Sequence, residues 1–296
     1  MRMGMSTVFC LLLLAGVAFT VQAAEPATAL SVSGHRIGEI FRDCRDVCPE
    51  MVVIPPGHFQ MGSPNDDWRH RTEEGPVHEV HIGYVFATSK YPVTRGEWRQ
   101  YVAATRHPSS NHCIGVGQNP DRNWLDPGFP QDDNHPVVCV TWDEAKGYIS
   151  WLSQKTGYHY RLLSDSEYEY INRAGSSTAY FWGDKWDRRR ANGGEKRLNG
   201  ADGPFQTSPV GSFQPNGFDL YDTTGNVASW TQDCWHDNYS GAPTDGSAWT
   251  AGDCSKRVFR GGGWSGSSDM LRAAFHFRGD PGKGLSVVGF RLARTN

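Results

Sequence analysis

The 296-residue chain has a net charge of −3, contains 34 glycines and 11 tryptophans, and is 38% hydrophobic. This balance excludes a strongly basic nucleic-acid-binding protein and a highly charged disordered chain, so we expect no nucleic-acid partner. The glycine and aromatic content predicts a loop-rich globular protein with aromatic anchors rather than a helical bundle. The length allows one large domain or two small ones.

The first 23 residues have the pattern of a secretory signal peptide. Arg2 supplies a positive charge, the apolar run FCLLLLAGVAF follows, and VQA is a small-residue cleavage site. The apolar run is short for a membrane span. We therefore predict an exported protein, periplasmic or secreted, cleaved after Ala23 or Ala24, with no membrane span in the mature chain. Residues 24–43 are predicted to form a leader without strong pattern.

Six cysteines remain once the signal peptide is removed. An even number of cysteines in an oxidising compartment indicates disulfides, and six cysteines allow fifteen pairings. We favour the pairings that each close one local loop, namely Cys44–Cys48, Cys113–Cys139 and Cys234–Cys254. The alternative is that Cys44 and Cys48 are redox-active or bind metal, but no histidine or second cysteine pair stands nearby at zinc spacing.

Two segments near the start predict strands. Residues 51–63, MVVIPPGHFQMGS, predict a strand pair that turns at Pro-Pro-Gly, and residues 77–94 predict another strand. His78 and His81 are three positions apart, so a strand points them to opposite faces and a shared metal ion is not expected.

Three helices are predicted from capping boxes, in which a hydroxyl accepts an unpaired backbone N–H and a glutamate three residues later reaches back. The pairs are Thr94 with Glu97, Thr141 with Glu144, and Ser164 with Glu167. Residues 176–260 are rich in Gly, Asn, Asp and Ser and predict long loops that need disulfides, ions or aromatic anchors. With no internal repeat or linker, residues 44–296 are predicted to form one domain.

Several segments together resemble the formylglycine-generating enzyme, or sulfatase-modifying factor, family. They are MVVIPPGHFQMGS at the start, HPVVCVTWDEAKGYISWLSQKTGYHYRLLSDSEYEYINRAG, PNGFDLYDTTGNVASW, and RVFRGGGW followed by LRAA and GFRLA. They occur in the family's order, and the match covers about residues 45–294. The resemblance implies an α+β fold, a single C-type-lectin-like domain with few helices, small twisted sheets and much ordered loop.

The resemblance also carries an expectation about metal chemistry. The best-known members of the family oxidise a sulfatase cysteine to formylglycine with oxygen and copper(I), a soft ion held by two cysteine thiolates. The two cysteine positions match Gly266 and Leu271 here, a serine near the oxygen site matches Gly263, and a tryptophan matches Ala228. Glycine and leucine side chains cannot bind a metal, so copper is not expected and sulfatase activation is the least favoured function.

Family members also carry two structural calcium sites. The positions matching the first are Asn192, Gly193, Asp202 and Pro204, and those matching the second are Asp222, Gly225, Val227 and Ser229. Calcium needs six to eight oxygen ligands from carboxylates, amides and carbonyls. Ser229 stands where the family usually has glutamate, which removes a charged ligand from the second site. The alternative is that these residues only make turns.

The favoured function is a binding or scaffold module for a protein or small-molecule ligand not yet identified. In the variable proteins of diversity-generating retroelements, the same C-terminal region displays hypervariable residues on loops. The comparable positions here are Ser265, Gly266, Ser267, Asp269, Met270, Phe275 and Phe277. Exposed Phe and Met would be binding anchors there. The alternative is that Met270 and Phe275 belong to the core.

The alternative function is an exported oxidoreductase or tailoring enzyme with altered chemistry. Some relatives without the cysteine pair act in periplasmic maturation of the siderophore pyoverdine. The candidate acid–base residues are His276 and Asp269, with Asp233, His236 and Asp237 in the element DCWHD. A structural histidine is the competing interpretation. Arg272, Arg278 and Arg291 either contact an anionic ligand or pair with buried carboxylates and carbonyls that hold the loops.

Overall fold

The computed structural model describes residue 1 and residues 31–108, 113–115, 122–194 and 206–295. Apart from Met1, the predicted signal peptide and the start of the predicted leader lie outside these residues. The helices of the described chain are α1 (Arg95–Thr105), α2 (Trp142–Thr156) and α3 (Asp165–Arg173). Each begins at a predicted capping box, with both reciprocal hydrogen bonds formed, so the three predicted helix starts are confirmed.

The first of two larger sheets brings both ends of the described chain together. It is antiparallel throughout and has the order β3 (Ile40–Phe41), β4 (Met51–Ile54), β7 (Phe86–Ser89), β15 (Leu292–Thr295) and β9 (His159–Leu162). Every residue of β4 and β7 is buried. Part of the predicted leader is therefore a strand of the sheet, because β3 pairs with β4.

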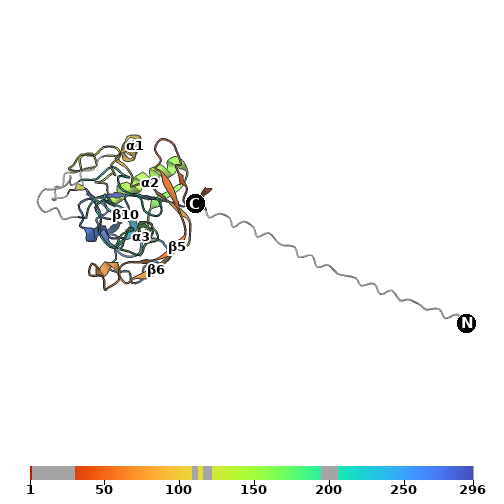
Figure 1. Cartoon of the computed structure of the whole chain (residues 1–296). Coiled ribbons are helices and arrows are strands. Elements are labelled where there is room, and N and C mark those ends of the chain that lie inside the picture. Colours follow the sequence, from red (N-terminus) through yellow and green to blue (C-terminus); the bar gives the residue numbers. More distant parts are fainter. Residues whose placement is uncertain (2–30, 109–112, 116–121, 195–205, 296) are drawn as a thin grey trace.

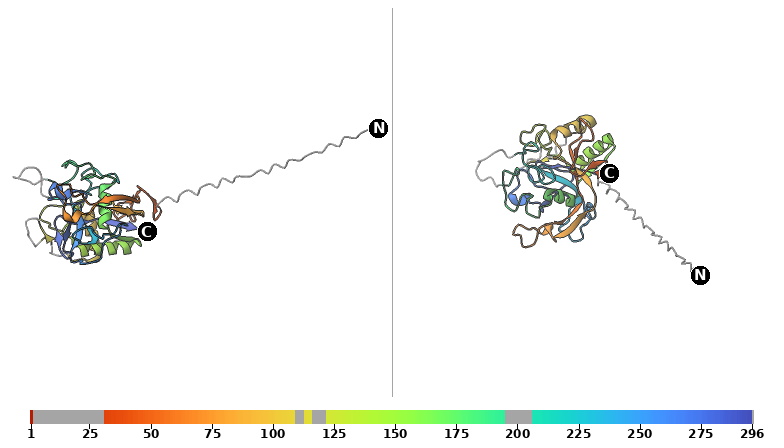
Figure 2. Two further views of the ribbon diagram at one scale, coloured as in Figure 1. Left: turned by 90° about the horizontal axis from the view of Figure 1, so that it is seen from below. Right: turned by 45° about the vertical axis from the view of Figure 1, so that its right-hand side comes forward.

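The second larger sheet leads into the glycine-rich segment, residues 261–266, which follows its strand β11. Its order is β12 (His276–Gly279), β11 (Arg257–Arg260), β10 (Ala228–Cys234) and β14 (Val288–Phe290), and only β10 and β14 are parallel. Figure 1 places α3 and β10 at the centre of the molecule, with α1 and α2 towards one side and β5 and β6 along its rim. The further views in Figure 2 show the same arrangement, with β5 and β6 curving around the edge. The fold is α+β, as predicted.

Smaller elements complete the architecture. The two-stranded sheets are β1 (Ser31–Val32) with β2 (His35–Arg36), β5 (Gly57–Met61) with β6 (His78–Ile82), and β8 (Cys113–Ile114) with β13 (Gly284–Leu285). Short 3₁₀ helices are η1 (Thr72–Glu74) and η2 (Ser268–Leu271).

The two strand predictions are corrected in detail. Residues 51–63 do form two strands, β4 and β5, but these strands do not pair with each other, because both edges of β4 are occupied by β3 and β7. Residues 77–94 contain two strands, β6 and β7, instead of one. In β6, His78 lies on the side of the buried Val80 and His81 lies on the exposed side, as the alternation predicted.

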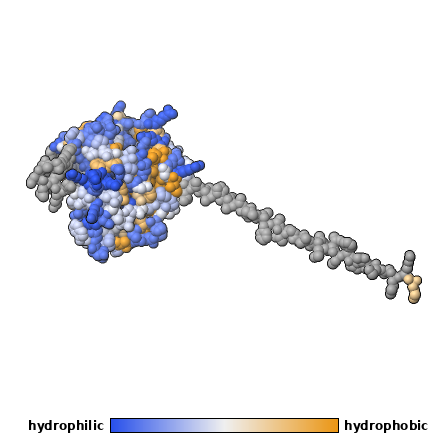
Figure 3. Space-filling model, in the orientation of Figure 1, coloured by the Kyte–Doolittle hydropathy of each residue, from blue (hydrophilic) through white to orange (hydrophobic). Residues whose placement is uncertain are grey.

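The three favoured disulfides are formed, Cys44–Cys48, Cys113–Cys139 and Cys234–Cys254. Cys44–Cys48 closes the loop between β3 and β4, whereas Cys113–Cys139 ties a loop to β8 and Cys234–Cys254 ties one to the end of β10. Among the described residues, no helix has the length and apolar character needed to cross a membrane. The face shown in Figure 3 is mostly hydrophilic, with hydrophobic residues in small patches.

One of the two fully buried tryptophans of the described residues, Trp98, joins three elements. Trp98 of α1 is fully buried, stacks on Tyr148 of α2 at 6.0 Å between ring centroids, and meets Phe290 of β14 edge to face at 6.0 Å. Aromatic side chains of this size contribute large buried areas and favour such tilted or edge-on contacts. Trp98 therefore anchors both long helices to the second sheet.

Trp98→Ala should lower the free energy of unfolding by about 3–5 kcal/mol, because it leaves a large cavity between α1, α2 and β14. Urea titration followed by circular dichroism measures the change. The matched control is Trp68→Ala, since Trp68 is 84% exposed, and a change within about 0.5 kcal/mol is expected there. Equal losses in both variants would contradict the assignment of Trp98 as the anchor.

Candidate functional site

The positions that match the family's two metal thiolates lie together in the fold. A Cβ built on Gly266 would stand 3.4 Å from Cδ2 of Leu271, and Leu271 is fully buried. The leucine side chain also packs against the backbone of Gly193 and Gly262. The space between these loops is therefore filled by hydrocarbon and backbone, and neither Gly266 nor Leu271 offers a side chain that could bind copper(I).

Direct hydrogen bonds hold the surrounding loops. The N–H of Gly194 donates to the carbonyl of Gly266 at 2.8 Å, and the N–H of Ser268 donates to the carbonyl of Gly194 at 3.1 Å. Arg272 is 2% exposed and makes a bidentate pair with Glu74 at 2.7 and 2.6 Å. Arg272 thus has the structural role that the sequence left as one of two options.

The predicted ligand-cleft residues differ in exposure. Ser265, Ser267 and Asp269 are half-buried, whereas Met270 and Phe277 are exposed at 39% and 45%. Phe275 is buried, with the guanidinium of Arg71 4.9 Å from its ring centroid. Of the two aromatic residues proposed as anchors, only Phe277 presents a large surface to solvent.

A buried polar network centred on Arg260 lies beneath the predicted ligand-cleft residues. Its Nε donates to the carboxylate of Asp165, its Nη1 lies 3.0 Å from Oε2 of Glu169, and its Nη2 donates to the hydroxyl of Tyr239 at 2.6 Å. The same hydroxyl lies 2.7 Å from Nδ1 of His276. Charge-assisted hydrogen bonds of this kind are the strong ones in protein interiors.

His276 is enclosed by its neighbours. The residue is 2% exposed, and its ring meets Trp235 edge to face at 5.1 Å between centroids. A histidine with so little exposed surface supports the structural interpretation, because it offers a substrate no accessible face. The sequence did not identify Arg260, Asp165 or Tyr239 as its partners, since they lie 16 to 111 residues away and share no local motif.

The pKa values of two carboxylates in the network are shifted in opposite directions. Burial opposes ionisation of Asp165, but Arg260 and His276 outweigh it and hold its pKa below the ordinary value. Burial and then the charge of Asp165 raise the pKa of Asp233 to about 8, although Asp233 accepts the N–H groups of Trp249 at 2.6 Å and Asp165 at 2.7 Å. Asp165 is therefore anionic and Asp233 protonated near neutral pH.

The remaining acid–base candidates do not join this network. His236 stacks on Trp249 at 3.4 Å between ring centroids, and Asp237 accepts the indole N–H of Trp235 at 2.9 Å. Asp237 also pairs with the exposed Arg278 at 3.4 Å. Of the acid–base candidates in DCWHD, only Asp233 is hydrogen-bonded to the network, through the backbone N–H of Asp165. Asp269 lies half-buried in η2, and its carbonyl accepts the Nε–H of Arg272 at 3.0 Å.

The first predicted calcium set lies partly outside the described residues, because Asp202 and Pro204 belong to 195–205. Within the described part, the side-chain amide of Asn192 donates to the carbonyl of Gln206 and to the hydroxyl of Ser208, both at 3.0 Å. Calcium at this set stays a prediction.

The second predicted calcium set comprises Asp222, Gly225, Val227 and Ser229. The carboxylate of Asp222 already accepts the N–H of Gly211 at 2.8 Å and the amide of Asn226 at 3.2 Å, and burial raises its pKa. The carbonyl of Gly225 accepts the N–H of Val227 at 2.8 Å. The carboxylate and the carbonyl each keep a further lone pair, so calcium at this set also stays a prediction.

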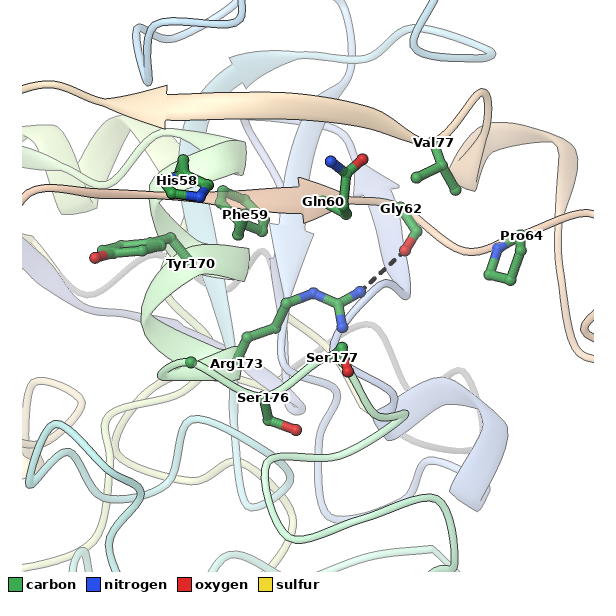
Figure 4. Close-up of a pocket in the computed structure, with 11 residues that line it drawn as sticks. His58, Phe59, Gln60, Gly62, Pro64, Val77, Tyr170, Arg173, Ser176 and Ser177 are labelled. Atoms are coloured by element: carbon green, nitrogen blue, oxygen red, sulfur yellow. Dashed lines mark hydrogen bonds between the residues drawn. The ribbon is translucent and has the colours of Figure 1, made fainter.

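A hollow of about 310 Å³ opens between β5 and the end of α3 (Figure 4). Phe59, Val77 and Tyr170 contribute its apolar surface, and His58 and Gln60 line its β5 side. The sequence did not predict it, because it arises where two elements more than a hundred residues apart approach each other. Its volume is at the small end of the range for ligand pockets.

Residues 36–296 match the sequence profile of the sulfatase-modifying factor enzyme 1-like domain. The chain belongs to this family. Within the curated proteins, it is 32% identical over 260 residues to the serine/threonine-protein kinase pkn1 of Chlamydia pneumoniae. The match covers 84% of this chain and 38% of the kinase. The chain therefore spans less than half the length of that relative.

Solved structures of the same fold extend the comparison. PvdO from Pseudomonas aeruginosa is 39% identical, has a TM-score of 0.78, and the match covers 88% of this chain and 99% of PvdO. Variable protein 1 of Treponema denticola is 22% identical with a TM-score of 0.66, over 87% of this chain and 99% of that protein. The second likeness shows the fold alone.

The raised pKa of Asp233 should appear as a pH dependence of stability. Asp233 keeps its proton up to about pH 8 in the folded state and releases it near pH 4 when unfolded, so folding stability falls as pH rises between these values. Asp233→Asn cannot titrate. The free energy of unfolding of the wild type relative to this variant should therefore fall by up to about 1.4 kcal/mol per pH unit between pH 5 and pH 8.

Urea titrations at half-unit pH intervals measure this difference. Asp280→Asn is the control, because it removes a partly exposed carboxylate, 4.0 Å from Lys256, without touching the buried network. Parallel curves for the wild type and Asp233→Asn would show that Asp233 is ionised throughout.

Proposed function

We propose that this chain is an exported tailoring protein of secondary metabolism, of the PvdO kind, that works without copper held by thiolates. The similarity to PvdO carries the proposal, because it is 39% identical and spans nearly the whole of both chains. Sequence reasoning favoured a binding or scaffold module and kept a tailoring enzyme for siderophore maturation as the alternative. The alternative now has the stronger support, since the likeness to the variable protein is only 22% identical.

The loop chemistry supports a reaction that differs from sulfatase activation. Leu271 fills the place of a metal ligand, and the half-buried Ser267 and Asp269 precede it in the same segment. These side chains can hydrogen-bond a polar substrate, and a carboxylate can accept a proton. Exposed Met270 and Phe277 supply apolar contact. A periplasmic or secreted location agrees with the three disulfides.

Deletion of the gene in its own organism should replace a mature exported metabolite, such as a siderophore, with a precursor of different mass. Mass spectrometry of the culture medium measures the change, and a plasmid copy of the wild-type gene should restore the mature compound. An Asp269→Asn copy should restore it less well if that carboxylate moves a proton. An unchanged set of exported metabolites in the deletion strain would contradict a tailoring role.

The purified protein should form no formylglycine on a sulfatase-derived peptide in the presence of copper(I) and oxygen. The reason is the absence of thiolate ligands at Gly266 and Leu271. Aldehyde capture followed by peptide mass spectrometry is the readout, with an active formylglycine-generating enzyme as the positive control. Stoichiometric aldehyde product would overturn the exclusion of the family's oxidase chemistry.

A further inference from the structure

Two histidines face each other across β5 and β6, on the exposed side of the pair. The register places His58 opposite His81 and Gln60 opposite Glu79. The N–H of His81 donates to the carbonyl of Thr244 at 2.8 Å, so it points away from β5. His58 and His81 are therefore a non-hydrogen-bonded pair, the arrangement in which opposed side chains come closest, with Cα atoms about 4.5 Å apart.

The strand alternation leaves both rings free to meet a solute. Phe59, Met61, Val80 and Ile82 turn inward on the other face, and the last three are buried. The side chain of His81 is 63% exposed, and His58 is also exposed. Figure 4 shows His58 and Gln60 on one side of β5, with Tyr170 and Arg173 of α3 on the other.

We propose that His58 and His81 form a two-histidine chelate for a divalent transition-metal ion, with water in the remaining coordination positions. The ring centroids are 5.7 Å apart and the rings are tilted by 30°. An ion bound to one nitrogen of each ring at about 2.0–2.1 Å would separate the centroids by about 4.5 to 6.4 Å, depending on the angle between the two metal–nitrogen bonds. The observed separation lies within that range.

The surrounding charge favours a cation at this pair. Oε2 of Glu79 lies 3.4 Å from Nε2 of His81, so a carboxylate stands beside the imidazole. No three His, Cys, Asp or Glu side chains converge on one ion in the described part of the chain, which is why the site has two protein ligands. Glu79 favours the bound cation through its negative charge and is not counted as a metal ligand.

The ligand type selects the class of metal. Neutral imidazole nitrogen suits Cu²⁺, Ni²⁺ and Zn²⁺, with Cu²⁺ bound most tightly, whereas calcium prefers oxygen ligands. The site is therefore distinct from the predicted calcium sets. A protonated imidazole cannot bind a metal, so metal binding should compete with protons and weaken in acid. Because both rings lie on the exposed side of β5 and β6, the water positions of the ion are open to small ligands from solvent.

Copper(II) is the probe for the test, added to the purified mature chain in a buffer with glycine as competitor. The wild type should bind with an affinity at least tenfold above that of His58→Asn and of His81→Asn, and electron paramagnetic resonance should show two nitrogen ligands. The double variant should lose no more than either single variant, because a chelate fails once one arm is removed. Glu79→Gln should weaken binding less than either histidine change.

His35→Asn is the control, because His35 is a partly exposed histidine that is also paired with a glutamate, Glu39, at 2.7 Å. It should leave the copper affinity unchanged. Circular dichroism confirms that each variant is folded. The proposal is overturned if His58→Asn and His81→Asn bind copper like the His35 control, or if their effects simply add, as independent imidazoles would.

Discussion

Helix α3 is buried on every side, and the structure depends on the neutralisation of its charged face. Asp165, Glu169 and Arg173 are spaced four residues apart and therefore lie along one face. Arg260 of β11 pairs with the first two, while Glu169 also accepts the N–H of Gly62 at 3.0 Å and pairs with Arg173. Leaving a charge of this kind without its partner costs about 3–5 kcal/mol, so these contacts fix α3 against both β5 and β11.

That constraint explains which parts of the fold could be predicted from the sequence. The start of α3 depends on Ser164 and Glu167, which are three residues apart. The starts of α1 and α2 depend on their own capping boxes in the same way. Such signals are local and the predictions were correct. The burial of α3 on all sides was not predictable, because Arg260 lies 95 residues from Asp165 and an amphipathic pattern implies one exposed face. The predicted pairing of β4 with β5 was wrong for the same reason, because the strand that pairs with β4 in its place, β7, lies further along the sequence.

The candidate site shows the same division between local and distant information. Sequence comparison placed Gly266 and Leu271 at the thiolate positions, and that substitution alone excludes copper(I) ligation there. It could not show that Leu271 would be fully buried against Gly193 and Gly262, or that His276 would be enclosed by Trp235. Residues chosen for their chemical type, such as His276 and Asp269, need accessibility to act, and accessibility is a property of the assembled loops.

The loops around Gly266 and Leu271 are held without thiolates at these positions, because other interactions fix them. Arg272 and Glu74 pair beneath the glycine-rich segment, and the buried Arg291 donates to the carbonyls of Ser89 and Tyr221. None of these contacts involves the positions where the metal ligands were replaced. A leucine at such a position adds buried apolar area in place of a reactive group, which stabilises the loop packing. The family's scaffold and its copper chemistry are therefore separable, and new chemistry can arise on the same loops without rebuilding the core.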